Sequence, residues 1–295
     1  MLNFLTYLIS GLSLGSVYAI IALGYTMVYG IAKMLNFAHG DIIMIGAYIA
    51  FTIITNVDIL PMPLVILIAC VACTILGVLV EKIAYRPLRG ANSLAVLITA
   101  IGVSYFLQNI ALLIFGANTK SFKSVVGLPA LKLFDGNLII QSETIVTILV
   151  CIIVMILLQL FVHKTKLGVA MQAVSEDQGA SKLVGINVDE TIAMTFAIGS
   201  FLACVAGVLL CSAYPTLTPT TGSMPGIKAF VAAVIGGIGS IPGAFVGGLL
   251  LGVLENLTKA YISSQLSDAI VFGLLIVVLL FKPTGILGKM NVEKV

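Results

Sequence analysis

The chain has 295 residues, of which 60% are hydrophobic and only 9% are charged, whereas a soluble domain carries about 25% charged residues. The mean hydropathy is +1.19, and a chain of this length has more apolar residues than one buried core can hold. Most of them must therefore face lipid or one another in a bilayer. This composition excludes a soluble fold, and a net charge of only +3 excludes a basic nucleic-acid surface. Because the apolar runs have helical length, we predict an all-α, polytopic transmembrane bundle and not a β-barrel.

Apolar runs along the chain predict eight or nine membrane segments. They lie at residues 5–32, 40–56, 62–82, 94–115, 143–163, 190–212, 226–240, 242–258 and 266–282. The first run has no positively charged leader, so we expect it to stay as the first helix. The run at 226–240 is short for a span and is interrupted by Gly236 and Gly237, which predicts a broken or re-entrant helix that lines a cavity. We expect residues 1–295 to form a single transmembrane domain.

The distribution of basic residues predicts the orientation. With nine crossings and an outer N-terminus, most Lys and Arg side chains lie on the inner side, which satisfies the positive-inside rule. The inner set is Lys33, Lys82, Arg86, Arg89, Lys164, Lys166, Lys182, Lys282, Lys289 and Lys294, and the outer set is Lys120, Lys123, Lys132 and Lys259. An arrangement with eight crossings, in which 226–240 is re-entrant, stays open.

Polar residues interrupt the hydrophobicity after the first run. Asn36, His39 and Asp41 stand close together in the sequence LNFAHGD. Ionisable groups inside membrane segments indicate functional sites, because burying them in hydrocarbon is expensive. One interpretation is a cavity-lining turn on a translocation path. The alternative is an interfacial turn in which Asp41 caps the next helix.

Small residues recur every four positions on two neighbouring faces of the stretch 239–252. These residues are Gly239, Gly243 and Gly247 on one face, and Ser240, Ala244, Gly248 and Gly252 on the other. Faces almost without side chains allow close helix packing, and Gly11 and Gly15 in the first run are expected to pack similarly. Paired short segments interrupted by glycine also mark substrate paths in transporters, so Gly236, Gly237 and Gly239 are candidate path residues.

The longest polar segment on the inner side covers residues 163–190, and an outer polar segment at 116–142 is interpreted as a solvated loop. The inner segment predicts a helix of one to two turns bounded by Gly168 and Gly185. From the pattern alone, an amphipathic connector on the membrane surface is the favoured interpretation. Its apolar stripe consists of Ala170, Ala173, Val174 and Leu183.

Several catalytic motifs are missing. Gly288 and Lys289 do not belong to a Walker A motif, because the earlier Gly and the following Ser or Thr are absent. His39 and His163 are far apart and fit no zinc-protease or nucleophile-elbow pattern, and the five cysteines fall in apolar runs as small hydrophobic residues. We therefore expect no catalytic, cofactor-binding or metal site. No carboxylate is convincingly central in a span, which argues for energy supplied by a partner and against an ion-coupled carrier.

Five stretches carry a family resemblance. They are GLSLGSVYAIIALGYTMVYGIAKMLNFAHGDIIMIGAY from Gly11, ITAIGVSYFLQN at 98–109, GVAMQAVSEDQGASKLVGIN from Gly168, TGSMPGIKAFVAAVIGGIGSIPGAFVGGLLLGVLEN at 221–256 and KPTGILGK from Lys282. Together they resemble the LivH type of branched-chain amino-acid ABC transporter permease. The NFAHG and GGIGSIPGAFVGG signatures are shared with the wider family of LivM and, more distantly, the ribose-type sugar permeases.

The resemblance implies a subunit of the bacterial inner membrane that pairs with a LivM-like permease and two LivG/LivF-like ATPases. It also implies that a periplasmic binding protein delivers leucine, isoleucine or valine, and that ATP binds only to the partner subunits. Urea, amide or sugar permeases of the same type, and less so an ion-coupled carrier, remain alternatives.

The resemblance further implies that residues 163–190 form a cytoplasmic coupling segment that docks into an ATPase, which replaces the connector interpretation. Many relatives carry Arg at the position of Gln172, so a contact expected there is weaker or replaced. The implied coupling residues are Gly168, Gln172, Glu176, Asp177, Gln178, Lys182 and Gly185.

Overall fold

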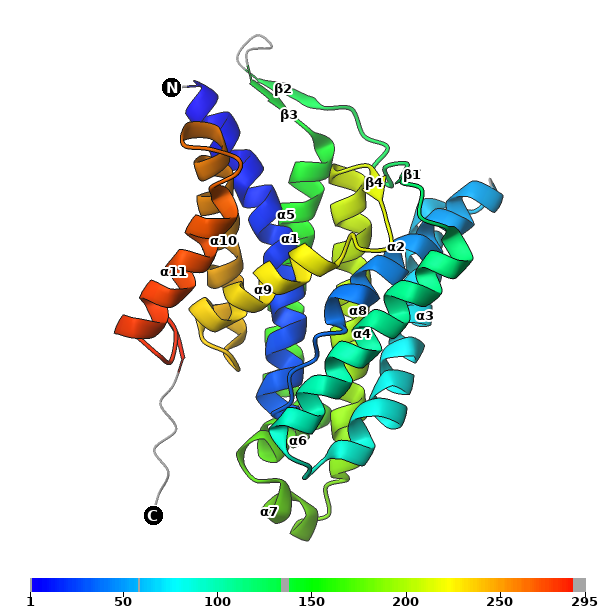
Figure 1. The fold of residues 1–295 in the computed structure, drawn as a ribbon, viewed down its shortest axis with the longest axis vertical. Coiled ribbons are helices and arrows are strands. Elements are labelled where there is room, and N and C mark those ends of the chain that lie inside the picture. Colours follow the sequence, from blue (N-terminus) through cyan, green and yellow to red (C-terminus); the bar gives the residue numbers. More distant parts are fainter. Residues whose placement is uncertain (1, 58, 134–137, 289–295) are drawn as a thin grey trace.

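The computed structural model describes residues 2–57, 59–133 and 138–288 as a helical bundle with short strands at one end (Figure 1). The helices are α1 (Leu2–Ala32), α2 (His39–Asn56), α3 (Met62–Val80), α4 (Ser93–Phe115), α5 (Ser142–Lys164), α6 (Lys166–Glu176), α7 (Gln178–Leu183), α8 (Val188–Ala213), α9 (Ser223–Gly236), α10 (Ile241–Tyr261) and α11 (Ser267–Phe281). A π-helical turn (Glu81–Tyr85) and a 3-10 turn (Arg86–Leu88) extend α3. Lys289 and Lys294, which we assign to the inner side, lie outside the described residues.

The predicted all-α, polytopic class is confirmed. Seven helices are long and apolar enough to cross a membrane, and the apolar helices α9 and α11 are shorter. All nine expected apolar runs are therefore helical, with their ends shifted by a few residues. The predicted run at 226–240 begins earlier, at Ser223, and ends at Gly236, because Gly237 leaves the helix with φ of 108°.

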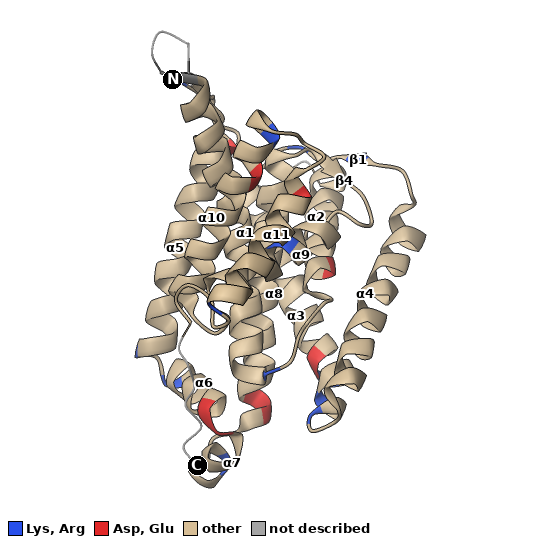
Figure 2. Cartoon of the chain, turned by 60° about the vertical axis from the view of Figure 1, so that its left-hand side comes forward, with Lys and Arg blue, Asp and Glu red and all other residues tan. Residues whose placement is uncertain are grey.

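The strands lie at the same end of the bundle as the start of α1, and α6 and α7 lie at the opposite end, called here the α7 end (Figure 1). Strand β1 (Lys120–Ser121) pairs antiparallel with β4 (Thr216–Leu217), and β2 (Leu131–Leu133) pairs with β3 (Leu138–Ile140). We expected the segment 116–142 to be a solvated loop. Its strand β1 instead pairs with β4, in the chain that follows α8. Figure 2 shows charged residues mainly towards the two ends, and α1 and α4 carry none.

The centre of the bundle is built by α1 and α8. In α8, 72% of the most apolar stretch is buried, whereas the corresponding fraction is 17% in α4 and 22% in α5. The exposed apolar side chains of α4 include Leu113 and Ile114. Since such a surface is unfavourable in water, these outer helices face lipid or another membrane subunit.

Close packing by small residues is confirmed, and the two faces of α10 contact two different helices. A methyl group at Gly248 or Gly252 would collide with the backbone of Ala19 or Gly15 in α1. On the other face, a methyl group at Gly247 would collide with the Ala232 carbonyl of α9. Glycine therefore lets α10 approach both neighbours at backbone distance.

Helices α2 and α9 both begin inside the bundle. At the start of α2, His39 lies against Gly24 of α1 and Gly199, which is near the middle of α8. A methyl group at Gly40 would come within 2.7 Å of the Gly222 carbonyl oxygen at the start of α9. The two helix starts therefore meet at mid-depth, and each is preceded by a non-helical segment that contains a turn.

The inner polar segment differs from the prediction of one short helix bounded by Gly168 and Gly185. Two helices, α6 and α7, are present, and the break falls at Asp177, whose carboxylate accepts hydrogen bonds from the amides of Gly179 and Ala180. Gly168 is inside α6 and packs against the backbone of Phe161 and Val162 in α5. Gly168 is therefore a packing residue within α6 and not the boundary of a helix.

Candidate translocation path and coupling surface

A cavity of about 270 Å3, called here the mid-depth cavity, lies where α2, α4 and α9 meet. Two serines and a glutamine give it a polar part, and aromatic and aliphatic side chains form the rest of its wall. Its lining residues are Tyr25, Phe37, Gly40, Asp41, Ile101, Ser104, Tyr105, Gln108, Ser223, Gly226 and Ile227. A partly polar cavity at this depth is typical of a substrate path.

Asp41 is the charged group of the mid-depth cavity. Its residue is 2% exposed, and its Oδ1 accepts a hydrogen bond of 2.9 Å from Gln108 Nε2. The same amide nitrogen lies 3.3 Å from Ser104 Oγ and 3.4 Å from Ser223 Oγ. Ala38, not Asp41, is the N-cap residue of α2, so the capping alternative does not hold. Among the described residues, no cation forms a salt bridge with Asp41.

Asn36 and His39 lie beside this cavity but do not line it. Asn36 is buried, and its Oδ1 accepts a hydrogen bond of 2.9 Å from the Tyr85 hydroxyl. The His39 ring lies 4.6 Å from the ring of Tyr25, which does line the cavity. Both residues are buried where the chain enters α2.

The structure does not bring Gly236, Gly237 and Gly239 to the mid-depth cavity. They form the turn between α9 and α10, where the Gly236 carbonyl accepts a hydrogen bond of 2.9 Å from the Leu287 amide. A methyl group at Gly236 would collide with the Gly243 carbonyl. Their geometry is that of tight packing, and their place on the path stays a prediction.

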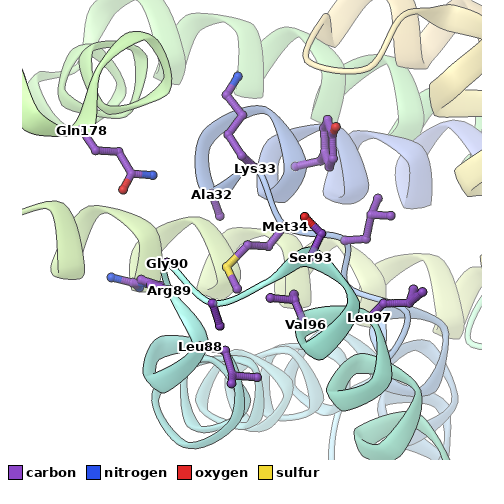
Figure 3. Close-up of a pocket in the computed structure, with 13 residues that line it drawn as sticks. Ala32, Lys33, Met34, Leu88, Arg89, Gly90, Ser93, Val96, Leu97 and Gln178 are labelled. Carbon is purple, nitrogen blue, oxygen red and sulfur yellow. The ribbon is translucent and has the colours of Figure 1, made fainter.

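A second cavity of about 360 Å3 lies at the α7 end, between the end of α1, the start of α4 and α7 (Figure 3). Its polar groups come from Tyr29, Lys33, Arg89, Ser93 and Gln178. Residues 33–35 line this cavity, and residues 37, 40 and 41 line the mid-depth cavity. The single segment 33–41 therefore borders both cavities.

The coupling residues implied by the resemblance are spread over α6, α7 and their flanks. Glu176, Asp177, Gln178 and Lys182 are exposed at the α7 end, and Gln172 is half-buried. Gly168 is buried, and Gly185 ends the segment with φ of 88°. Leu183, which is not among the residues implied by the resemblance, is 90% exposed and presents an apolar side chain beside these polar residues.

Next to this surface, ion pairs join the end of α3 to the start of α8. Asp189 pairs with both Arg86 and Arg89, and Arg89 also pairs with the buried Glu81. Arg86 and Arg89, two of the basic residues at the end of α3, are thus held in ion pairs.

A buried charge cluster was missed. Glu255 is 1% exposed, and its carboxylate accepts hydrogen bonds from Tyr18 (2.8 Å), Lys228 (2.7 Å) and Lys259 (2.5 Å). Lys228 also pairs with Asp268 at 2.7 Å. The expectation that no carboxylate is central is wrong for Asp41, which is buried at mid-depth, whereas Glu255 is buried in the last two turns of α10.

Two cavity residues were also missed, Ser104 and Ser223. Ser104 and Gln108 are four positions apart on α4 and thus share one helix face, a signal that was available in the sequence. Ser223 belongs to α9 and reaches Gln108 only through the fold.

The helices define a multi-pass membrane protein, and the partly polar cavity at mid-depth is typical of transport proteins. A comparison with protein families identifies which one: the chain belongs to the family described as branched-chain amino acid transport system / permease component, whose model matches residues 7–279. This match and the 45% identity to LivH over the whole chain confirm the resemblance to the LivH type.

Curated relatives match over nearly their whole length. The chain is 48% identical to the high-affinity branched-chain amino acid transport system permease protein BraD of Pseudomonas aeruginosa, covering 99% of this chain and 98% of BraD. It is 45% identical to LivH of Salmonella typhimurium, covering 100% of this chain and 98% of LivH. A probable LivH of Methanocaldococcus jannaschii is 30% identical over 91% of this chain and 88% of that protein.

Proposed function

We propose that this chain is the permease subunit of an ABC importer for branched-chain amino acids in the bacterial inner membrane. The observation that carries the proposal is the match over nearly the full length to BraD and LivH, at 48% and 45% identity. The mid-depth cavity supports it, because a permease needs a polar site bordered by apolar helices, and this cavity opens at the side where Ile101, Tyr105 and Ile227 are exposed.

The proposed complex contains a LivM-like second permease, two LivG/LivF-like ATPases and a periplasmic substrate-binding protein. ATP is hydrolysed on the ATPases, so this chain needs neither a catalytic nor a cofactor site of its own. The exposed apolar faces of α4 and α5 are available to lipid and to the second permease.

The path runs from the mid-depth cavity towards the cavity at the α7 end. Segment 33–41 borders both cavities, so a shift of this segment can close one while opening the other. Such movement of packed elements is a common form of alternating access.

The coupling surface consists of Glu176, Asp177, Gln178, Lys182 and Leu183, and it faces the cytoplasm in this proposal. Helix α6 packs on α5 through Gly168 and buries Met171 and Val174. Because α6 is held against the bundle in this way, closure of the ATPases on α7 is transmitted to the membrane helices as a movement of rigid elements.

The function is tested by reconstituting the chain with its partners in proteoliposomes and measuring uptake of labelled leucine. We expect uptake only with ATP inside and loaded binding protein outside. Uptake driven by an ion gradient without the ATPases contradicts the proposal. Uptake of labelled urea or ribose, without leucine uptake, assigns the chain to the related permeases.

The coupling surface is tested by co-purification with the ATPases. The substitution Leu183→Asp places a charge on the exposed apolar tip of α7, and we expect it to reduce ATPase recovery. Leu128→Asp is the matched control, since Leu128 is 66% exposed and lies in the segment 116–142, which joins α4 to α5 at the strand end. Equal recovery with both variants contradicts this docking surface.

A further inference from the structure

We infer that Asp41 binds the ammonium group of the transported amino acid in the mid-depth cavity. This inference rests on the proposed function and adds the residue that recognises the substrate class. It follows from how the buried charges of the chain are compensated, from the other groups in the cavity and from its size.

Asp41 differs from the other buried carboxylates in its partners. Three carboxylate residues are buried in the described part of the chain: Asp41, Glu81 and Glu255. Glu81 pairs with Arg89, and Glu255 pairs with Lys228 and Lys259. Asp41 accepts hydrogen bonds only from neutral side chains, those of Gln108 and Ser104, and has no salt bridge within that same part of the chain. A buried carboxylate is stabilised by a nearby cation, and a cationic ligand in the cavity supplies the one that Asp41 lacks within this part of the chain.

The surrounding groups fit an ammonium ion. Ser104 Oγ and Ser223 Oγ lie within 3.4 Å of the Gln108 amide nitrogen that contacts Asp41, so several oxygen acceptors converge on one side of the cavity. An ammonium group has three donors and no acceptor, which matches one carboxylate and neighbouring hydroxyls. Within the described residues, no cluster of three metal-ligating side chains is present, which disfavours a divalent cation at Asp41.

The rest of the cavity fits an aliphatic side chain. Phe37, Ile101 and Ile227 line the same space. Its volume of about 270 Å3 lies just below the ~300–1,000 Å3 of pockets for drug-sized ligands, as expected for a smaller molecule. A charged group on one side and an apolar wall on the other correspond to the two ends of leucine.

The inference is tested by thermal unfolding of the purified permease–ATPase complex, without binding protein, in the presence of three small molecules. L-leucine carries both charges, isoamylamine lacks the carboxylate, and isocaproate lacks the ammonium group. A ligand that binds the folded state raises the melting temperature. We expect L-leucine and isoamylamine to raise it and isocaproate to leave it unchanged. Equal protection by isocaproate, or no protection by any of the three, overturns the inference.

Two variants localise the effect. Asp41→Asn keeps the shape and removes the charge, and we expect it to weaken the apparent affinity for isoamylamine about tenfold or more. Glu190→Gln removes an exposed carboxylate at the α7 end and should keep the wild-type shift. An unchanged shift in Asp41→Asn contradicts the inference, and the wild-type ligand series decides the matter if that variant does not fold. A complex that imports leucine but shows no ammonium-dependent shift overturns this inference alone, whereas loss of leucine import with a normal shift overturns the proposed function.

Discussion

Asp41 and Glu255 are buried to nearly the same degree, at 2% and 1% exposure, but their surroundings differ. Glu255 accepts hydrogen bonds from two lysines and a tyrosine, which come from α1, α9 and α10. Asp41 accepts hydrogen bonds from two neutral side chains, the Gln108 amide and the Ser104 hydroxyl, and faces a cavity. The first carboxylate is compensated inside the protein, and the second is left for a ligand.

This difference separates a structural charge from a functional one. Removing one partner of a buried ion pair leaves the other charge uncompensated, which is strongly destabilising. Removing a buried charge that has no charged partner leaves no uncompensated charge in the protein. The two sites should therefore respond oppositely to the same chemical change from carboxylate to amide.

The largest effect is expected for Glu255→Gln, which leaves Lys259 without its ion pair and Lys228 with Asp268 only. We expect the free energy of unfolding to fall by about 3 kcal/mol. The five cysteines of the chain are buried and free, so labelling of this chain by a thiol-reactive dye on heating reports unfolding. Glu190→Gln is the matched control on the surface, and a melting temperature equal to that of the control would show that the Glu255 cluster is not structural.

A smaller loss is expected for Gly222→Ala, at the point where α9 meets α2. The added methyl group would collide with the Gly40 carbonyl, and overpacking of this kind costs about 1–3 kcal/mol. Because the collision moves α9 at the cavity wall, leucine uptake should fall as well. Gly273→Ala in α11 has open space around it, and uptake by that control should match wild type. Normal uptake and normal melting in Gly222→Ala contradict the close contact.

A local effect is expected for Asp177→Ala, which removes the N-cap of α7. Loss of such a cap costs about 1 kcal/mol, and it should appear as faster amide hydrogen exchange in residues 178–183. Asp177→Asn retains a side-chain oxygen that can accept the same hydrogen bonds and should exchange as wild type does. Similar exchange in the Ala and Asn variants would show that the cap does not hold α7.

The smallest effect on stability is expected for Asp41→Asn. Its amide oxygen can still accept the hydrogen bond from Gln108, and no buried cation loses a partner. The melting temperature should equal that of wild type or exceed it. A loss as large as that of Glu255→Gln would mean that Asp41 is compensated by a group within the protein, and the comparison between the two sites would fail.

The helices could be predicted from the sequence because each apolar run has the length of a membrane span, and the four-residue glycine spacing correctly predicted the close packing of α10. The break at Asp177 was missed although its signal is local, since an aspartate before a short polar helix is a typical N-cap.

The site was only partly predictable. Asp41 stands out as an ionisable residue in the polar interruption between two apolar runs, and it does line the mid-depth cavity. Its relation to Gln108 and Ser223 depends on how α2, α4 and α9 pack, and sequence spacing carries no information on that. The same holds for Lys228 and Glu255, which belong to different helices and become a buried pair only in the folded bundle.

The ratio of leucine imported to ATP hydrolysed, measured in proteoliposomes with the complete complex, tests the central claim most directly. If Asp41 provides the missing charge for the ammonium group of the substrate, this ratio falls about tenfold in Asp41→Asn and stays at the wild-type value in Glu190→Gln. An Asp41→Asn complex that imports as many leucine molecules per ATP as wild type would contradict the account.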